Sequence, residues 1–192
     1  LPPALRGFFV VSEVTMNKNT RKLVITALLV AVGLLLPFLT GQIPQIGSAL
    51  SPLHIPVLLC GFVCGGFWGA LCGFILPLLR YLLFTMPPMY PAAIAMAFEM
   101  ATYGLVTGLM YKRTPKGIAG TLISLITAML CGRVVWGIAR YVLTFSGPSQ
   151  FSVALFIAGA FADAIPGIIL HIILIPILVT ALERANLISK ED

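Results

Sequence analysis

Residues 23–39 read LVITALLVAVGLLLPFL, a run without a charged residue that closely follows Lys18, Arg21 and Lys22. A helix needs about 20 predominantly apolar residues to cross the hydrocarbon core of a bilayer. Lys and Arg gather at the cytoplasmic ends of such helices. This stretch therefore predicts a first transmembrane helix whose N-terminal end lies in the cytoplasm.

Further apolar runs follow the first one along the chain. They cover residues 53–63, 67–84, 92–111, 118–145 and 153–182. Turn-forming residues separate the runs, among them the Gly65-Gly66 pair between the second and the third. The second run is short, so we expect it either to cross where the bilayer is thin or to be partly re-entrant. The pattern predicts an all-α, polytopic membrane protein with six transmembrane helices.

The remaining basic residues agree with an even number of crossings. Lys112, Arg113 and Lys116 stand between the fourth and fifth runs, and Arg184 and Lys190 follow the sixth. The loops after the first, third and fifth runs contain no Lys or Arg. Both termini are therefore predicted to be cytoplasmic.

Composition excludes the soluble and disordered classes of protein. Hydrophobic residues make up 59% of the chain and charged residues 9%, whereas a soluble domain carries roughly a quarter charged residues. Disorder needs the opposite balance. The net charge of +6 does not form a basic stripe interleaved with aromatics, so no nucleic-acid partner is predicted. We expect an N-terminal tail at 1–16, the membrane domain at 17–185 and a cytoplasmic tail at 186–192.

Motifs for catalysis and for nucleotide hydrolysis are missing from the sequence. It contains no G-x-x-x-x-G-K-[ST] loop, no H-E-x-x-H and no G-x-S-x-G. The four cysteines lie inside apolar runs without zinc-site spacing, and we interpret them as small packing residues. We therefore predict no metal, no cofactor, no enzymatic activity and no energy source for transport within the chain itself.

Five ionisable residues lie deep inside the apolar runs, where each costs at least ~2.5–3.5 kcal/mol. They are Arg80, Glu99, Arg133, Arg140 and Asp163, with a formal sum of +1. At the helical rise per residue, Glu99, Arg133 and Asp163 lie roughly 12–17 Å in from the outer ends of their runs. These three residues can therefore meet in one layer of the membrane.

Two interpretations of these charges stay open. In the first, Arg133 pairs with Glu99 or Asp163 and locks helices together. In the second, the charges line an outward-opening cavity in which Arg140 and Arg80 meet the ligand. Because the charges sum to +1, an anionic substrate group such as a carboxylate could supply the missing negative charge, and Arg binds such a group bidentately.

Aromatic residues accompany the charges. Arg133 and Arg140 are two helical turns apart and share a face, with Trp136 between them. Glu99 and Tyr103 share a face of the fourth run. We include both aromatic residues in the candidate substrate-binding site.

The outer loops add further candidates. Gln42 and Gln45 lie in the first outer loop, and Met86 and Tyr90 in the second. These polar or adaptable groups could fold over a bound ligand as a lid. Ordinary loop solvation explains each of them equally well.

Three stretches resemble a known family, the substrate-binding S-components of energy-coupling factor (ECF) vitamin importers. They are the small pair Ala27-x-x-x-Ala31, the sequence LHIPVLLCGF at 53–62 before a Gly-rich turn, and PPMYPAAIAMA at 87–97. The resemblance covers roughly residues 17–185. The part from 53 to 103 is similar to the branch with riboflavin-, folate- and pantothenate-type subunits.

The resemblance implies a concrete activity. Such subunits bind a vitamin or its precursor tightly from outside the cell. They dock on a transmembrane coupling subunit through a small-residue face, here Ala27 and Ala31, and two cytoplasmic ATPases drive toppling of the loaded subunit. This places the chain in a prokaryotic plasma membrane. A pantothenate-like anion is our first choice of substrate by charge, and a pyridoxine- or pyrimidine-type vitamin is the second.

Other classes of function remain as alternatives. A self-powered, proton-coupled transporter would use Asp163, Glu99 and His171. An intramembrane enzyme would use the same acids in catalysis, although no nucleophile or metal constellation accompanies them. A structural membrane subunit would bind no ligand.

Overall fold

The computed structural model describes residues 17–39, 51–115, 117–144, 165–185 and 188, and this part of the chain is helical without a strand. The helices are α2 (Lys18–Leu39), α4 (His54–Cys64), α5 (Gly66–Phe84), η1 (Met89–Ala93), α6 (Ile94–Arg113), α7 (Ile118–Thr144) and α9 (Ile165–Arg184). With η1 and α6 taken as one span, five helices are long and apolar enough to cross a membrane, and α4 is shorter. The predicted all-α, polytopic fold is confirmed.

The helix ends differ from the predicted runs in ways that local chemistry explains. Helix α2 begins at Lys18 rather than at residue 23, so the bases form its first turns. The fourth run was predicted from residue 92, whereas its span begins at Met89 with η1. The extended backbone of Tyr90 (φ −114°, ψ 132°) interrupts the helix there. The sixth run was predicted from residue 153, and its part before Ile165 lies outside the described residues.

Helix α4 is short because the chain turns sharply at its end. Gly65 has φ +92° and ψ 172°, a conformation that only glycine adopts readily, and α5 begins at the next residue. The predicted break at Gly65-Gly66 is therefore confirmed. At 11 residues, α4 is about 16 Å long, roughly half the thickness of a bilayer's hydrocarbon core.

Glycines let α5 and α6 touch through their backbones. A Cβ on Gly104 would lie 2.1 Å from the carbonyl carbon of Gly69, and one on Gly73 would lie 2.2 Å from the carbonyl oxygen of Met100. Small residues at such positions allow membrane helices to pack closely. Glycine recurs at every fourth position from 61 to 73, and of these four residues Gly65 alone has no neighbour near its missing Cβ, because it forms the turn.

Replacing Gly104 with Ala is expected to lower the free energy of unfolding by about 1–3 kcal/mol, because the added methyl group meets backbone that cannot swing aside. Titration with a denaturing detergent measures the change. The neighbouring Leu105→Ala is the control, since that side chain is 41% exposed. Equal stability of Gly104→Ala and the wild type would show that α5 and α6 are not in backbone contact.

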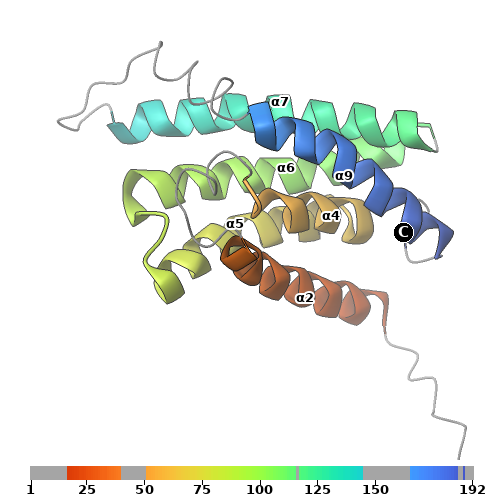
Figure 1. Ribbon diagram of the computed structural model, residues 1–192, viewed down its shortest axis with the longest axis horizontal. Coiled ribbons are helices and arrows are strands. Elements are labelled where there is room, and N and C mark those ends of the chain that lie inside the picture. The colour runs from red at the N-terminus through yellow and green to blue at the C-terminus, as the bar shows by residue number, and fades with distance from the viewer. Residues whose placement is uncertain (1–16, 40–50, 116, 145–164, 186–187, 189–192) are drawn as a thin grey trace, which may run out of the picture.

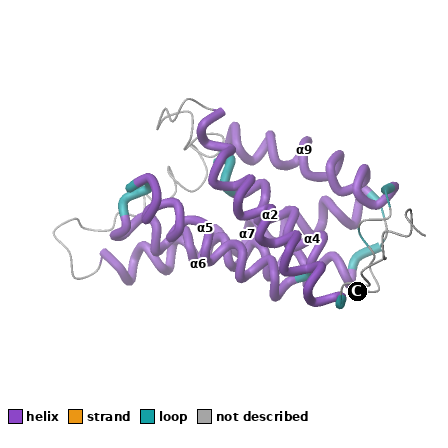
Figure 2. Tube along the Cα trace, turned by 90° about the horizontal axis from the view of Figure 1, so that it is seen from below, coloured by secondary structure: helices purple, strands orange, loops and turns teal. Residues whose placement is uncertain are grey.

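Helix α4 lies at the centre of the bundle (Figure 1), in contact with α2, α5, α6 and α9. Most of its residues are buried, including Val57, Leu58 and Cys60. The outer helices turn large apolar side chains away from the protein, such as Leu28 and Ile177, each at least 60% exposed. Figure 2 shows the same helices from below, with α2 and α4 side by side. An apolar exterior around a packed centre suits a protein surrounded by lipid.

The basic ends of the helices gather at one end of the bundle. In Figure 1 the start of α2, the α6–α7 turn and the end of α9 lie on the same side. Contacts agree, because the Cys64 thiol donates to the Lys22 carbonyl at 3.7 Å and the Tyr111 hydroxyl donates to Glu183. This grouping is what the predicted cytoplasmic location of both termini requires.

Candidate functional site

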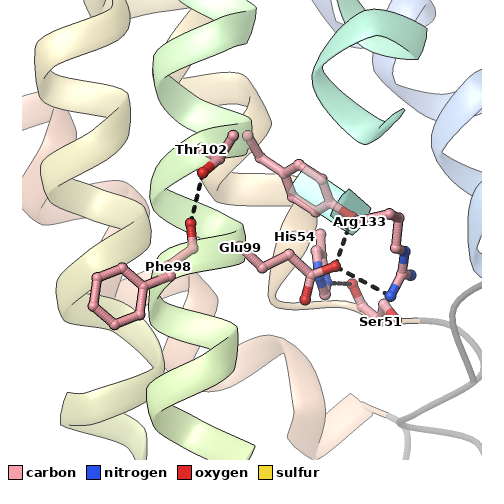
Figure 3. A network of polar contacts seen from close by, with 7 residues as sticks. Ser51, His54, Phe98, Glu99, Thr102 and Arg133 are labelled. Atoms are coloured by element: carbon pink, nitrogen blue, oxygen red, sulfur yellow. Dashed lines mark hydrogen bonds and ion pairs between the residues drawn. The ribbon is translucent and has the colours of Figure 1, made fainter. Parts of the chain in front are cut away.

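A buried charge cluster joins α6 to α7 inside the bundle (Figure 3). Arg133 Nη1 lies 3.1 Å from Glu99 Oε1, and the Tyr103 hydroxyl donates to the same oxygen at 2.7 Å. The Glu99 side chain is 2% exposed and that of Arg133 13%. The sequence left open whether Arg133 pairs with Glu99 or Asp163, and the described residues contain the first of these pairs.

The local sequence explains this arrangement. Glu99 and Tyr103 are one helical turn apart on α6, so both point to the same neighbour. On α7, a Cβ on Gly132 would lie 2.1 Å from Cε1 of Tyr103. Glycine at this position therefore admits the tyrosine ring against the backbone of α7, next to Arg133.

Two histidines extend the cluster. Neither was among the predicted substrate-binding residues, although His171 was named for the proton-coupled alternative. His54 opens α4, and its Nε2 lies 4.0 Å from Glu99 Oε1. Its ring centroid is 5.2 Å from that of Tyr103 and 5.9 Å from that of His171 on α9. The sequence showed both rings inside apolar runs. That His54 faces Glu99 depends on the short α4, which begins in the middle of the bundle rather than at its edge.

Several buried polar atoms of the cluster have no hydrogen-bond partner among the described residues. Nε2 of His54, Nε2 of His171 and Nε of Arg133 are all buried and unpartnered. His54 and His171 are only 5% and 3% exposed. Buried polar groups in folded proteins are nearly always hydrogen-bonded, so a group of unsatisfied atoms in one place indicates a site that another molecule completes.

A second group of predicted residues lies farther along α7. The Arg140 guanidinium is 5.6 Å from the centroid of the Trp136 ring, a cation–π contact. Nearby, the Tyr90 hydroxyl of η1 donates to the carbonyl of Leu143. The structure thus brings Tyr90 to the end of α7 that carries Arg140, about two helical turns from Arg133.

Arg80 and Met86 lie elsewhere. Arg80 is buried, donates from Nη1 to the carbonyl of Leu34 at 3.3 Å and lies 5.5 Å from the Phe84 ring centroid. These contacts join α5 to α2 and do not reach the Glu99 cluster. Met86, in the segment before η1, is 45% exposed.

The remaining predicted residues divide into two sets. Gln42, Gln45 and Asp163 lie outside the described residues. Ala27 and Ala31 are exposed and lie one turn apart on α2, the spacing at which two residues share a helix face. No described residue packs over them, so this face of the subunit is open to lipid or to another protein.

The described residues contain no group of three or more His, Cys, Asp and Glu side chains that could hold a metal ion. Cys60, Cys64 and Cys72 are buried, whereas Cys131 is exposed. The chemistry available in the cluster is hydrogen bonding and charge pairing.

A family model described as the substrate-specific component of ECF transporters matches residues 21–179. The match runs from α2 into α9 and includes every residue of the Glu99 cluster. No curated protein and no solved structure matches the chain. The chain therefore belongs to the family of substrate-specific components of ECF transporters, and it is a multi-pass membrane protein that serves as the substrate-binding subunit of such a transporter.

Proposed function

We propose that this subunit captures a vitamin or vitamin precursor, tightly and from the outer side of a prokaryotic plasma membrane. A pantothenate-like anion is the first choice, and a pyridoxine- or pyrimidine-type vitamin is the second. The loaded subunit then topples on a coupling subunit driven by two cytoplasmic ATPases and carries the substrate inward.

The charge balance of the membrane-spanning helices supports an anionic substrate as the first choice. Arg80, Arg133 and Arg140 are three cations, and Glu99 is the one acid in the described spans apart from Glu183 at the end of α9. Glu99 already binds Arg133. Arg140 has no carboxylate partner among the described residues, and a substrate carboxylate could pair with its guanidinium bidentately.

The surroundings of Arg140 suit a ligand site. Trp136 offers an aromatic surface beside the guanidinium. Tyr90 is 56% exposed and is held near Arg140 by its bond to Leu143. Convergent polar groups beside aromatic side chains are typical of small-molecule sites.

The exposed Ala27 and Ala31 supply the docking face. Small side chains let a helix of the coupling subunit approach the backbone of α2 closely. No nucleotide-binding loop occurs in this chain, so the energy for transport would come from the ATPase partners.

Mass spectrometry of the protein extracted gently from a membrane tests the proposal. We expect a small carboxylate-bearing molecule to co-purify in a one-to-one ratio and to rebind after removal. A co-purified cation would contradict the choice of an anion, and no ligand together with no binding of any of the three vitamin types would contradict the proposal.

Replacing Arg140 with Ala is expected to weaken binding of that molecule about 10- to 100-fold, because a charge-assisted bond to its carboxylate is lost. Titration calorimetry measures the affinity, and thermal unfolding checks the fold. Arg113→Ala is the matched control, since Arg113 is exposed in the last turn of α6. A variant that melts earlier but keeps full affinity would make Arg140 a structural residue.

A further inference from the structure

The hydrogen bond made by His54 fixes which of its ring nitrogens carries a proton. His54 Nδ1 lies 3.0 Å from the backbone carbonyl oxygen of Ser51. A carbonyl oxygen only accepts, so Nδ1 is the donor in this bond. In the neutral ring, Nε2 then presents a lone pair and needs a donor.

That lone pair faces another acceptor. Nε2 of His54 is 4.0 Å from Oε1 of Glu99, too far for a direct hydrogen bond. Arg133 already balances the charge of Glu99, so the pair does not require a second cation. One N–H or O–H group placed between two acceptors at this separation can donate to both through a bifurcated bond, and an NH2 group or a water can donate one hydrogen to each.

On the other side of the cluster, Arg133 lacks an acceptor rather than a donor. Arg133 uses Nη1 for Glu99, while its Nε has no partner in the described part of the chain and can only donate. An acceptor atom would satisfy it. His171 Nε2 is also unpartnered and can take either role, according to which ring nitrogen is protonated.

We propose that His54, Glu99 and Arg133 bind the part of the substrate in which an N–H or O–H donor stands next to an acceptor. A secondary amide and an amino-substituted ring with a neighbouring ring nitrogen both have this pattern. The inference rests on the proposed substrate-binding function and narrows its substrate class. His171 on α9 completes the site from the opposite side, with its ring 5.9 Å from that of His54.

The test varies both the ligand and the protein. Purified full-length protein is titrated with pantothenate, pyridoxine and an aminopyrimidine. It is also titrated with an ester analogue of pantothenate, in which oxygen replaces the amide N–H, and with a methylpyrimidine that lacks the amino group. His54→Phe and His171→Phe keep a ring but remove the nitrogen atoms. Tyr111→Phe is the control, because its hydroxyl bonds to Glu183 at the other end of the bundle.

We expect the ligand that binds to lose affinity about 10- to 100-fold when its donor is removed. His54→Phe should weaken the complete ligand to a similar extent and leave the affinity for the donor-less analogue nearly unchanged. Tyr111→Phe should bind both ligands as the wild type does. If His54→Phe does not fold, His171→Phe and the analogue pair in the wild type still give the result.

Two results would overturn the inference, and only the second would also overturn the proposed function. If a ligand binds equally well with and without its donor, or His54→Phe and His171→Phe change nothing, a trapped water fills the site and the proposed function survives. If no probe binds and no molecule co-purifies, the proposed function fails together with the inference.

Discussion

Glu99→Leu should lower the free energy of unfolding by about 3–5 kcal/mol, because it leaves the guanidinium of Arg133 buried without its counter-charge. The variant also removes the acceptor of the Tyr103 hydroxyl. Unfolding by a denaturing detergent, followed by circular dichroism, measures the loss. Glu183→Leu is the matched control at the end of α9, where the partner is the hydroxyl of Tyr111 rather than a cation.

A second replacement separates charge from packing. Adding Arg133→Met to Glu99→Leu should restore most of the lost stability, since exchanging a whole buried pair for apolar residues is often neutral. Restored stability without restored substrate affinity would mean that the pair also contacts the ligand. A double variant as unstable as Glu99→Leu alone would contradict an electrostatic origin of the loss.

Ala31→Phe should abolish uptake by the assembled transporter while leaving substrate affinity within about twofold of the wild type, a difference well below 1 kcal/mol. Ala31 is exposed on α2, so a large side chain there disturbs no contact within the subunit but holds a docking helix away. Vesicle uptake driven by ATP and calorimetric titration measure the two quantities. Ala27→Phe should behave in the same way.

An exposed alanine on another helix provides the control for this substitution. Ala119 lies in the first turn of α7, away from α2, and Ala119→Phe should retain uptake. If Ala31→Phe lost affinity as severely as uptake, α2 would be packed against the rest of the subunit through this face, and the docking proposal would fail.

The sequence predicted the layout of the helices because that layout depends on local properties. Apolar length gives the spans, Gly65 marks the turn, and Lys and Arg mark the helix ends. The sequence also named Glu99 and Asp163 as the two possible partners of Arg133, since all three lie at a similar depth, and the described residues contain the pair with Glu99.

The details of the site depended on packing that no local pattern contains. His54 reaches Glu99 because α4 begins in the middle of the bundle. One of the two open interpretations placed Arg80 in a ligand cavity, and its contacts among the described residues are to the carbonyl of Leu34 and the ring of Phe84. From the sequence alone, a buried arginine that donates to a backbone carbonyl cannot be distinguished from one that binds an anionic ligand.

We propose that this chain binds a solute and depends on its partner subunits for the energy of transport. Uptake of radiolabelled substrate into vesicles containing the purified chain alone tests it, with and without an imposed proton gradient. We predict tight binding with no accumulation under either condition, and accumulation once the coupling subunit, the ATPases and ATP are added. Accumulation by the chain alone in response to the proton gradient would contradict this dependence on partner subunits and identify a proton-coupled transporter.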